Sequence, residues 1–214
     1  MKAEFRIKTR ADIPVVTGAL VGINIVIWVI MELLGDTQDS RYMLEWGAAY
    51  LPYITVGKEW WRIFTCMFLH FGADHLMNNM LILGLTGMRL EHTLGHLRFG
   101  VLYLASGMCG SLLSLYEEMH MAEASVSAGA SGAVFGVIGG LLAWALLNKG
   151  KVEGLSAKGL VGMAALSLYY GFSVSGIDNA GHIGGLAGGF VLGCIFAILS
   201  KIVDFRKRKP YTID

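Results

Sequence analysis

Residues 124–147 read ASVSAGASGAVFGVIGGLLAWALL and contain no charged side chain. A helix that crosses the apolar core of a bilayer needs about 20 mostly apolar residues, so this stretch predicts a membrane-spanning helix. Ser131 stands near its start in the sequence Gly-Ala-Ser-Gly. Gly132, Gly136 and Gly140 then recur at every fourth position, a spacing that suits close packing between membrane helices. The stretch therefore predicts one helix of a membrane bundle, with a serine near its beginning.

Five other stretches are similarly apolar, and the composition agrees with lipid as the surrounding solvent. Charged residues make up only 15% of the chain, whereas a soluble domain carries about a quarter. The six predicted spans are residues 15–31, 75–88, 99–116, 124–147, 159–177 and 180–200. We expect an all-α bundle of six transmembrane helices forming a single domain over residues 1–214. A short segment, 1–13, would precede the bundle, and a basic tail, 201–214, would follow it.

The distribution of basic residues tests this parse, because cytoplasmic loops of membrane proteins are enriched in Lys and Arg. If the six spans alternate in direction, all but three of the 17 Lys and Arg residues fall on one side. The exceptions are Arg41, Lys58 and Arg62. The asymmetry predicts a multi-pass protein of the cell membrane with both termini in the cytoplasm. A net charge of +1 provides no basic field for nucleic acid, which we do not expect as a partner.

The loop between the first two spans, roughly residues 35–71, is too long for a tight connection. It contains Trp46, Tyr50, Tyr53, Trp60 and Trp61. Because Trp and Tyr favour the membrane–water interface, we expect a structured outer loop that is partly embedded in the bilayer.

The three cysteines, Cys66, Cys109 and Cys194, lie in apolar surroundings without the paired spacing of metal ligands. We interpret them as small core residues and expect neither a disulfide framework nor a zinc site.

Polar residues inside the predicted spans gather at one depth, and each is a functional candidate because such residues are unfavourable in lipid. His75 and Asn79 are four residues apart near the start of the second span and so share a helix face, while Asp74 is placed to cap that helix. Ser131 and His182 lie near the starts of the fourth and sixth spans. Spans two, four and six all start on the side away from the basic loops, so the three sets should meet slightly below the outer surface.

A hydroxyl, an imidazole and a pair of donors are the parts of an acyl-transfer site. A serine hydroxyl needs a base to remove its proton, and His182 is the candidate base for Ser131. His75 and Asn79, together with backbone N–H groups near Ser131 and the positive end of its helix, are candidates to stabilise an oxyanion.

These residues resemble the motifs of the rhomboid family of intramembrane serine proteases. Gly129-Ala130-Ser131-Gly132 matches the family's GxSG motif, and the spacing of His70, His75 and Asn79 matches the pattern on its second helix. The sequence Asn-Ala-Gly-His-Ile-Gly-Gly at 179–185 is similar to the histidine motif of its sixth helix, and Trp61-Arg62 to the Trp-Arg pair of its outer loop.

The resemblance implies a rhomboid-like six-helix bundle with a catalytic dyad of Ser131 and His182 and no third carboxylate. It also implies an oxyanion hole from His75, Asn79 and the Ser131 backbone, without a metal or other cofactor. Expected substrates are single-span membrane proteins, cut near a small residue where the helix unwinds easily. The family often has a tyrosine where this chain has Phe135, and we expect the ring to stack on His182 without the hydroxyl.

Structural interpretations of these residues stay open beside the functional one. Ser131 is also compatible with packing in the glycine stripe, and His182 with a polar residue satisfied inside the bundle. Asn179 could cap its helix or belong to the site, and His70 could support the site or bond locally. Gly129 and Gly132 would let the backbone bend and a neighbouring helix approach.

Two other functions compete with proteolysis. A catalytically silent relative that binds membrane clients would be expected to lack the serine or the histidine, and this chain has both. A small transporter predicts repeated halves and broken midplane helices, and no convincing internal repeat is evident.

Overall fold

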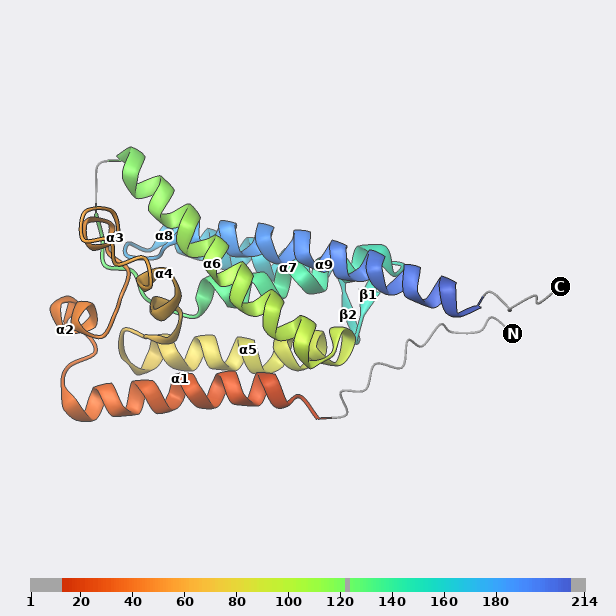
Figure 1. Cartoon of the computed structure of the whole chain (residues 1–214), viewed down its shortest axis with the longest axis horizontal. Helices are drawn as coiled ribbons and strands as arrows, with labels where there is room; N and C mark the ends of the chain where they lie inside the picture. The colour runs from red at the N-terminus through yellow and green to blue at the C-terminus, as the bar shows by residue number, and fades with distance from the viewer. Residues whose placement is uncertain (1–12, 122–123, 209–214) are drawn as a thin grey trace.

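The computed structural model describes residues 13–121 and 124–208 of the chain, and these are helical over most of their length (Figure 1). The long helices are α1 (Val15–Leu34), α5 (Gly72–Leu94), α6 (His96–Met121), α7 (Ser131–Leu147), α8 (Ala157–Ser173) and α9 (Asn179–Arg208). Each of the six predicted stretches therefore contains a helix, and the prediction of an all-α architecture is confirmed. Most of the predicted segment 1–13 and the end of the predicted tail 201–214 lie outside the described residues, and α9 continues through the first part of that tail.

Within the described part of the chain, three helices are long and apolar enough to cross a membrane: α1, α6 and the Asn179–Val203 part of α9. Helix α7 is apolar as well but shorter, at 17 residues. The protein is accordingly a membrane protein.

Short elements connect the long helices. The outer loop between α1 and α5 holds α2 (Ser40–Glu45), α3 (Leu51–Thr55), α4 (Arg62–Thr65) and the 3-10 turn η1 (Cys66–Phe68). Strands β1 (Lys151–Val152) and β2 (Leu155–Ser156) form an antiparallel hairpin between α7 and α8. Figure 1 shows the outer-loop helices at one end of the bundle and the hairpin toward the other, where α1 begins and α9 ends. We call these the outer and the inner end.

Helix α7 lies in the middle of the bundle, packed closely against α9. A Cβ at Gly185 of α9 would overlap the carbonyl oxygen of Gly132, and one at Gly189 would overlap that of Gly136. The two helices therefore touch backbone to backbone, and the predicted role of the glycine stripe in helix packing is confirmed. Because both helices begin at the outer end, this contact limits how far their first turns can move apart.

The predicted fourth span begins too early in the sequence. Helix α7 starts at Ser131, and the preceding residues 124–130 form a non-helical segment that we call the serine loop. Ser127 in this loop forms a two-way backbone bridge with Ala49 of the outer loop, with both N–H···O distances at 2.9 Å. An uncharged sequence is compatible both with a helix and with a non-helical segment. Here Ser127 pairs with Ala49, which lies far away in the sequence, and the segment is not helical.

At the inner end, Glu91 of α5 is fully buried and holds the start of α1. Its carboxylate accepts hydrogen bonds from the backbone N–H groups of Val16 and Thr17, from the Thr17 hydroxyl, and pairs with His96. The first N–H groups of a helix have no partners within it, so Glu91 supplies the acceptor that α1 lacks.

Candidate active site

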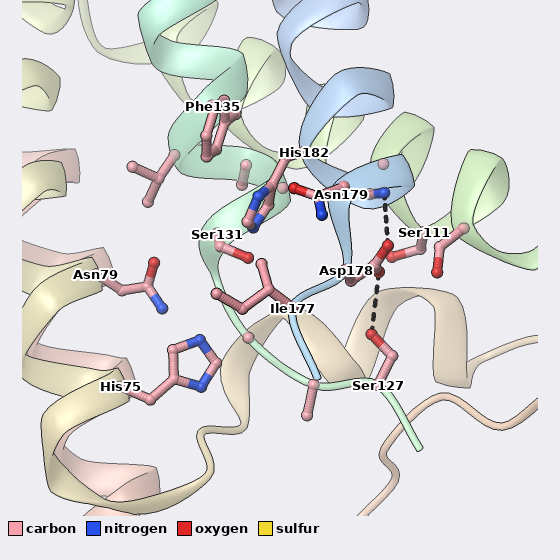
Figure 2. A pocket seen from close by; sticks show the side chains of 18 of the residues that line it. His75, Asn79, Ser111, Ser127, Ser131, Phe135, Ile177, Asp178, Asn179 and His182 are labelled. Atoms are coloured by element: carbon pink, nitrogen blue, oxygen red, sulfur yellow. Dashed lines mark hydrogen bonds between the residues drawn. The ribbon is translucent and has the colours of Figure 1, made fainter. Parts of the chain in front are cut away.

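A cavity of about 910 Å³ lies at the outer end, where α5, α7 and α9 begin (Figure 2). Ser131, His182, His75 and Asn79 all line it. The cavity thus brings together the four residues to which the sequence assigned chemical roles. Gly129, Gly132, Phe135 and Asn179 line it too, whereas His70 does not line it and instead bonds to the backbone of Ala130.

Ser131 is half-buried and opens α7, so the backbone before it decides where its hydroxyl points. The N–H of Gly129 donates to the carbonyl of Cys66 at 3.0 Å, and the N–H of Ala130 donates to Nε2 of His70 at 3.3 Å. With the bridge from Ser127, the outer loop therefore holds the serine loop at three points. The first turn of α7 also begins at Ser131. The N–H groups of this turn have no partners within the helix, and a helix N-terminus favours negative charge.

Gly129 is required where the serine loop passes His75. Its φ is +151°, and a Cβ on it would lie 2.7 Å from Cε1 of His75 and 3.7 Å from the Ser131 hydroxyl oxygen. The His75 ring and the Ser131 hydroxyl therefore converge on the space that a side chain at position 129 would fill.

His70 is buried against His75, with the ring centroids 5.2 Å apart in an edge-on arrangement. Burial, reinforced by the neighbouring His75, lowers the pKa of His70 to about 3. The ring is therefore neutral at physiological pH, as a nitrogen that accepts the Ala130 N–H must be. The sequence left open whether His70 supports the site or bonds locally. The structure shows His70 bonded to the serine loop, 60 residues further along the chain.

His182 lies in the first turn of α9, only 9% exposed. Its ring stacks on Phe135 with centroids 4.3 Å apart and planes 13° apart, as expected for an aromatic residue at that position (Figure 2). In residues 13–121 and 124–208, its Nδ1 finds no hydrogen-bond partner, and no direct hydrogen bond joins it to Ser131. Such contacts are often loose in an enzyme without substrate. The two side chains face the same cavity, and the stacking fixes the plane of the imidazole.

Asn79 follows His75 by one helical turn and is 6% exposed. Its amide nitrogen has no acceptor among the described residues. An unpaired buried donor is unfavourable by about 1–3 kcal/mol, so its retention suggests an acceptor that arrives with a ligand. The expectation that Asp74 caps this helix was wrong. The helix begins at Gly72, whose N–H donates instead to the Thr37 hydroxyl at 3.2 Å, and Asp74 is exposed in the first turn.

The start of α9 is capped by Asp178, a residue that the sequence analysis missed. Its Oδ1 accepts from the N–H of Gly181 at 2.7 Å, and its Oδ2 accepts from the Ser127 hydroxyl at 3.1 Å (Figure 2). An Asp directly before an apolar helical stretch is an ordinary N-cap signal, so it could have been found. Asn179 is therefore not the cap. Its Oδ1 is buried, has no partner in the described part of the chain, and lies where a Cβ on Gly171 of α8 would overlap it.

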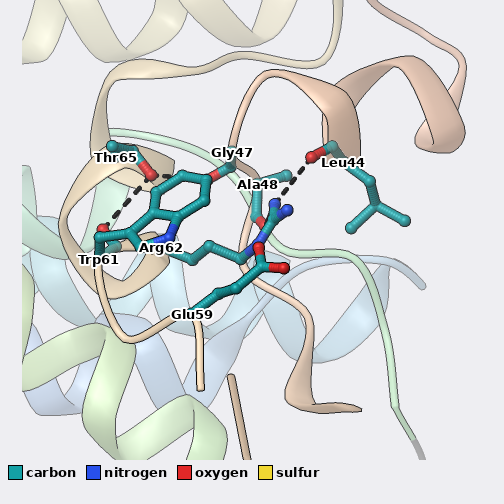
Figure 3. A network of polar contacts seen from close by, with 7 residues as sticks. All are labelled: Leu44, Gly47, Ala48, Glu59, Trp61, Arg62 and Thr65. Atoms are coloured by element: carbon teal, nitrogen blue, oxygen red, sulfur yellow. Dashed lines mark hydrogen bonds and ion pairs between the residues drawn. The ribbon is translucent and has the colours of Figure 1, made fainter. Parts of the chain in front are cut away.

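The outer loop that holds the serine loop is organised around Arg62 (Figure 3). This buried guanidinium pairs with Glu59 at 2.6 Å and donates to the carbonyls of Leu44 and Ala48 at 2.7 and 2.9 Å. It also lies 4.6 Å from the centroid of the Trp61 ring. A buried charge needs such partners, so Arg62 ties the parts of the outer loop into one unit.

The cysteines do not share one environment. Cys66 is buried beside the cavity, with its thiol near the Ser111 hydroxyl at 3.5 Å, and burial raises the pKa of Cys66 to about 11. Cys109 is exposed on α6, which corrects the expectation that all three are core residues. In a membrane helix the apolar side can face lipid, so an apolar sequence does not distinguish core from surface. In the residues that the structure describes, no group of three or more His, Cys, Asp or Glu side chains is arranged to hold a metal ion.

Comparisons with known proteins point to one family. The family model for the Rhomboid domain matches residues 57–198. Rhomboid protease GluP of Bacillus subtilis (strain 168) is 36% identical over 213 residues, which cover 97% of this chain and 41% of GluP.

Relatives are found in other organisms as well. RHOMBOID-like protein 1 of Arabidopsis thaliana is 39% identical over 82% of this chain and 44% of its own length. Rhomboid-like protease 3 of Toxoplasma gondii is 31% identical over 81% of this chain and 66% of its own length. The chain spans about half the length of most of the curated relatives that it matches.

Proposed function

This chain belongs to the rhomboid family, and from that premise we propose that it is an intramembrane serine endopeptidase that cleaves transmembrane segments of membrane proteins. The observation that carries the proposal is the meeting, in one cavity, of a serine at a helix N-terminus, a buried histidine and a buried amide with an unpaired donor. A silent relative would not need these groups in one place.

We assign the chemical steps to Ser131 and His182. His182 removes the proton of the Ser131 hydroxyl as its oxygen attacks the scissile carbonyl, and then gives that proton to the leaving amine. Water attacks the resulting ester by the same steps in reverse order, with His182 again as the base. The stack with Phe135 keeps the imidazole in one plane through both stages.

The negative charge on the carbonyl oxygen needs donors that are already in place. We assign this role to the Asn79 amide, the His75 ring and the Ser131 N–H. The unpaired Asn79 nitrogen and the approach of His75 to Gly129 support the assignment. His70 and Gly129 then act indirectly, because their hydrogen bonds fix the serine loop, which precedes Ser131 in the sequence.

We further propose that all six long helices cross the cell membrane, with both termini in the cytoplasm and the outer loop partly embedded. The half-exposed Trp60 and Trp61 support an interfacial loop, and the bias of Lys and Arg supports the orientation. A reporter fused after Asp214 should then read as cytoplasmic, and a tag within residues 117–123 should react from outside. The opposite pattern would exclude this arrangement. The substrates would be single-span membrane proteins, cut near a small residue where their helix unwinds.

The decisive experiment compares wild type with Ser131→Ala in detergent, using a generic transmembrane substrate. Cleavage should disappear in Ser131→Ala and persist in Ser173→Ala, a control that removes an exposed hydroxyl bonded only within its own helix. Equal cleavage by wild type and Ser131→Ala would exclude the proposed function. Binding of the substrate without cleavage by wild type would favour a silent client-binding protein.

A further inference from the structure

Asp178 connects the two segments that carry the proposed nucleophile and base. One carboxylate oxygen accepts from Ser127, four residues before Ser131, and the other accepts from the N–H of Gly181, one residue before His182. In residues 13–121 and 124–208, the bond from Ser127 is the one hydrogen bond between the serine loop and the start of α9. The other bonds of the loop go to the outer loop, to Glu118 of α6, or, from the Ala130 carbonyl, to Val134 of the following helix α7.

The local geometry around Asp178 is built for this contact. Its own backbone carbonyl accepts the N–H of His182 at 3.1 Å, so residue 178 bonds to the backbone of the proposed base as well. A Cβ on Gly181 would lie 2.5 Å from the carboxylate, so glycine leaves the space that the cap occupies. Figure 2 shows the carboxylate between Ser127 and the first turn of α9.

The position of Ser131 relative to His182 depends on such supports. The two side chains share no hydrogen bond in the described structure, and the glycine contacts between α7 and α9 begin at Gly132, after the serine loop. Ser131 and His182 lie in the first turns, where a helix lacks half of its backbone bonds and frays most easily. A displacement of about 1 Å between reacting groups can reduce a rate about a hundredfold.

We propose that Asp178 is a positioning residue, which sets the distance between Ser131 and His182 by clamping the serine loop to the first turn of α9. The inference rests on the proposed function. It names Asp178 as a residue that acts through its two hydrogen-bonded neighbours and does not touch the substrate.

Three substitutions separate the parts of this contact. Asp178→Ala removes both the cap and the clamp, while Ser127→Ala removes the clamp and keeps the cap. Asp178→Asn keeps both, because an amide oxygen can accept from Gly181 and an amide N–H can donate to the Ser127 hydroxyl, and it removes only the charge. The matched control is Ser156→Ala, which removes an N-cap from α8 at the inner end.

We expect Asp178→Ala and Ser127→Ala each to lower kcat about tenfold or more with KM changed less than about threefold, since position and not binding is lost. The double variant should be no slower than Asp178→Ala alone, because both changes break one contact. Asp178→Asn and Ser156→Ala should stay within about threefold of wild type. Normal kcat in Ser127→Ala, or a loss in Asp178→Asn as large as in Asp178→Ala, would overturn the clamp.

A second measurement does not depend on catalysis. Backbone hydrogen exchange of residues 124–130, followed by mass spectrometry, should accelerate in Asp178→Ala and Ser127→Ala and stay near wild type in Asp178→Asn. Unchanged exchange in the first two variants would overturn the clamp even if activity fell. If wild type showed no Ser131-dependent cleavage, the proposed function and the positioning role would both fail, while the exchange would still report whether Asp178 holds the loop.

Discussion

Glu91 and Asn79 lie near opposite ends of the same helix, α5, and both are buried, yet their polar atoms are satisfied very differently. At the inner end, Glu91 receives hydrogen bonds from α1 and pairs with His96. At the outer end, two buried nitrogens have no hydrogen-bond partner among the described residues: the Asn79 amide nitrogen and Nδ1 of His182. Buried polar groups are ordinarily paired. A fully paired group therefore indicates a structural role, whereas unpaired groups that face one cavity indicate a place prepared for a reacting molecule.

The largest effect should come from the proposed base. His182→Ala should reduce cleavage to the level of Ser131→Ala, and the double variant should be no worse, because residues that act as a unit fail together. Thermal unfolding should change little, since His182 contributes stacking on Phe135 and no side-chain hydrogen bond in the described structure. Substantial cleavage by His182→Ala at equal expression would reject the dyad and make the outer end structural like the inner one.

The oxyanion donors come next. Asn79→Ala and His75→Ala should each lower kcat about a hundredfold or more, with KM much less affected, because the donors act on charge that develops in the transition state. Unfolding should become easier by only about 1 kcal/mol. Ser131 should still react with a small serine-directed phosphonate, more slowly than in wild type. Turnover and melting temperature must be measured on the same preparation, and a large loss of stability with near-normal turnover at low temperature would assign the pair to packing.

The inner end should give the reverse result. Glu91→Gln keeps the size of the side chain and removes a charge that receives several hydrogen bonds, so we expect about 1–3 kcal/mol of destabilisation. Turnover per folded molecule should remain near wild type below the melting transition. Glu45→Gln, an exposed glutamate of α2, is the matched control and should change neither quantity. A large fall in kcat without a change in unfolding would contradict the division between the two ends.

The sequence predicted one end of α5 much better than the other. The meeting of Ser131, His182, His75 and Asn79 at one cavity could be predicted, because each stands in a short motif near the start of an apolar stretch, and starts of alternate spans meet on one side. The role of Glu91 depends on Thr17, which lies 74 residues away in the chain, and no local pattern identifies such a partner.

Contacts across long stretches of sequence also explain the errors. The start of α7 was placed too early because Ser127 pairs with Ala49, far away in the sequence, and residues 124–130 are not helical. The sequence next to Asp178 could have predicted that this residue caps α9. It could not have predicted the bond from Ser127, which lies 51 residues away in the chain. The exposed Cys109 could not be placed, since lipid and protein interior select the same apolar residues.

The smallest effect concerns Phe135, where stacking and hydroxyl chemistry can be separated. The ring lies almost parallel to that of His182 at 4.3 Å, and such a contact contributes about 0.5–1.5 kcal/mol through ring faces that Phe and Tyr share. Phe135→Tyr should therefore change kcat by less than about threefold, whereas Phe135→Leu should lower it by about threefold to tenfold, because an apolar group without a ring face holds the imidazole plane less well. Both variants should keep the melting temperature near wild type, since each fills much of the same space. Turnover of wild type, Phe135→Tyr and Phe135→Leu on one substrate decides the matter. Equal turnover in Phe135→Leu and wild type would mean that the plane of the His182 ring is held by its helix alone, and Phe135 would join the packing residues of α7.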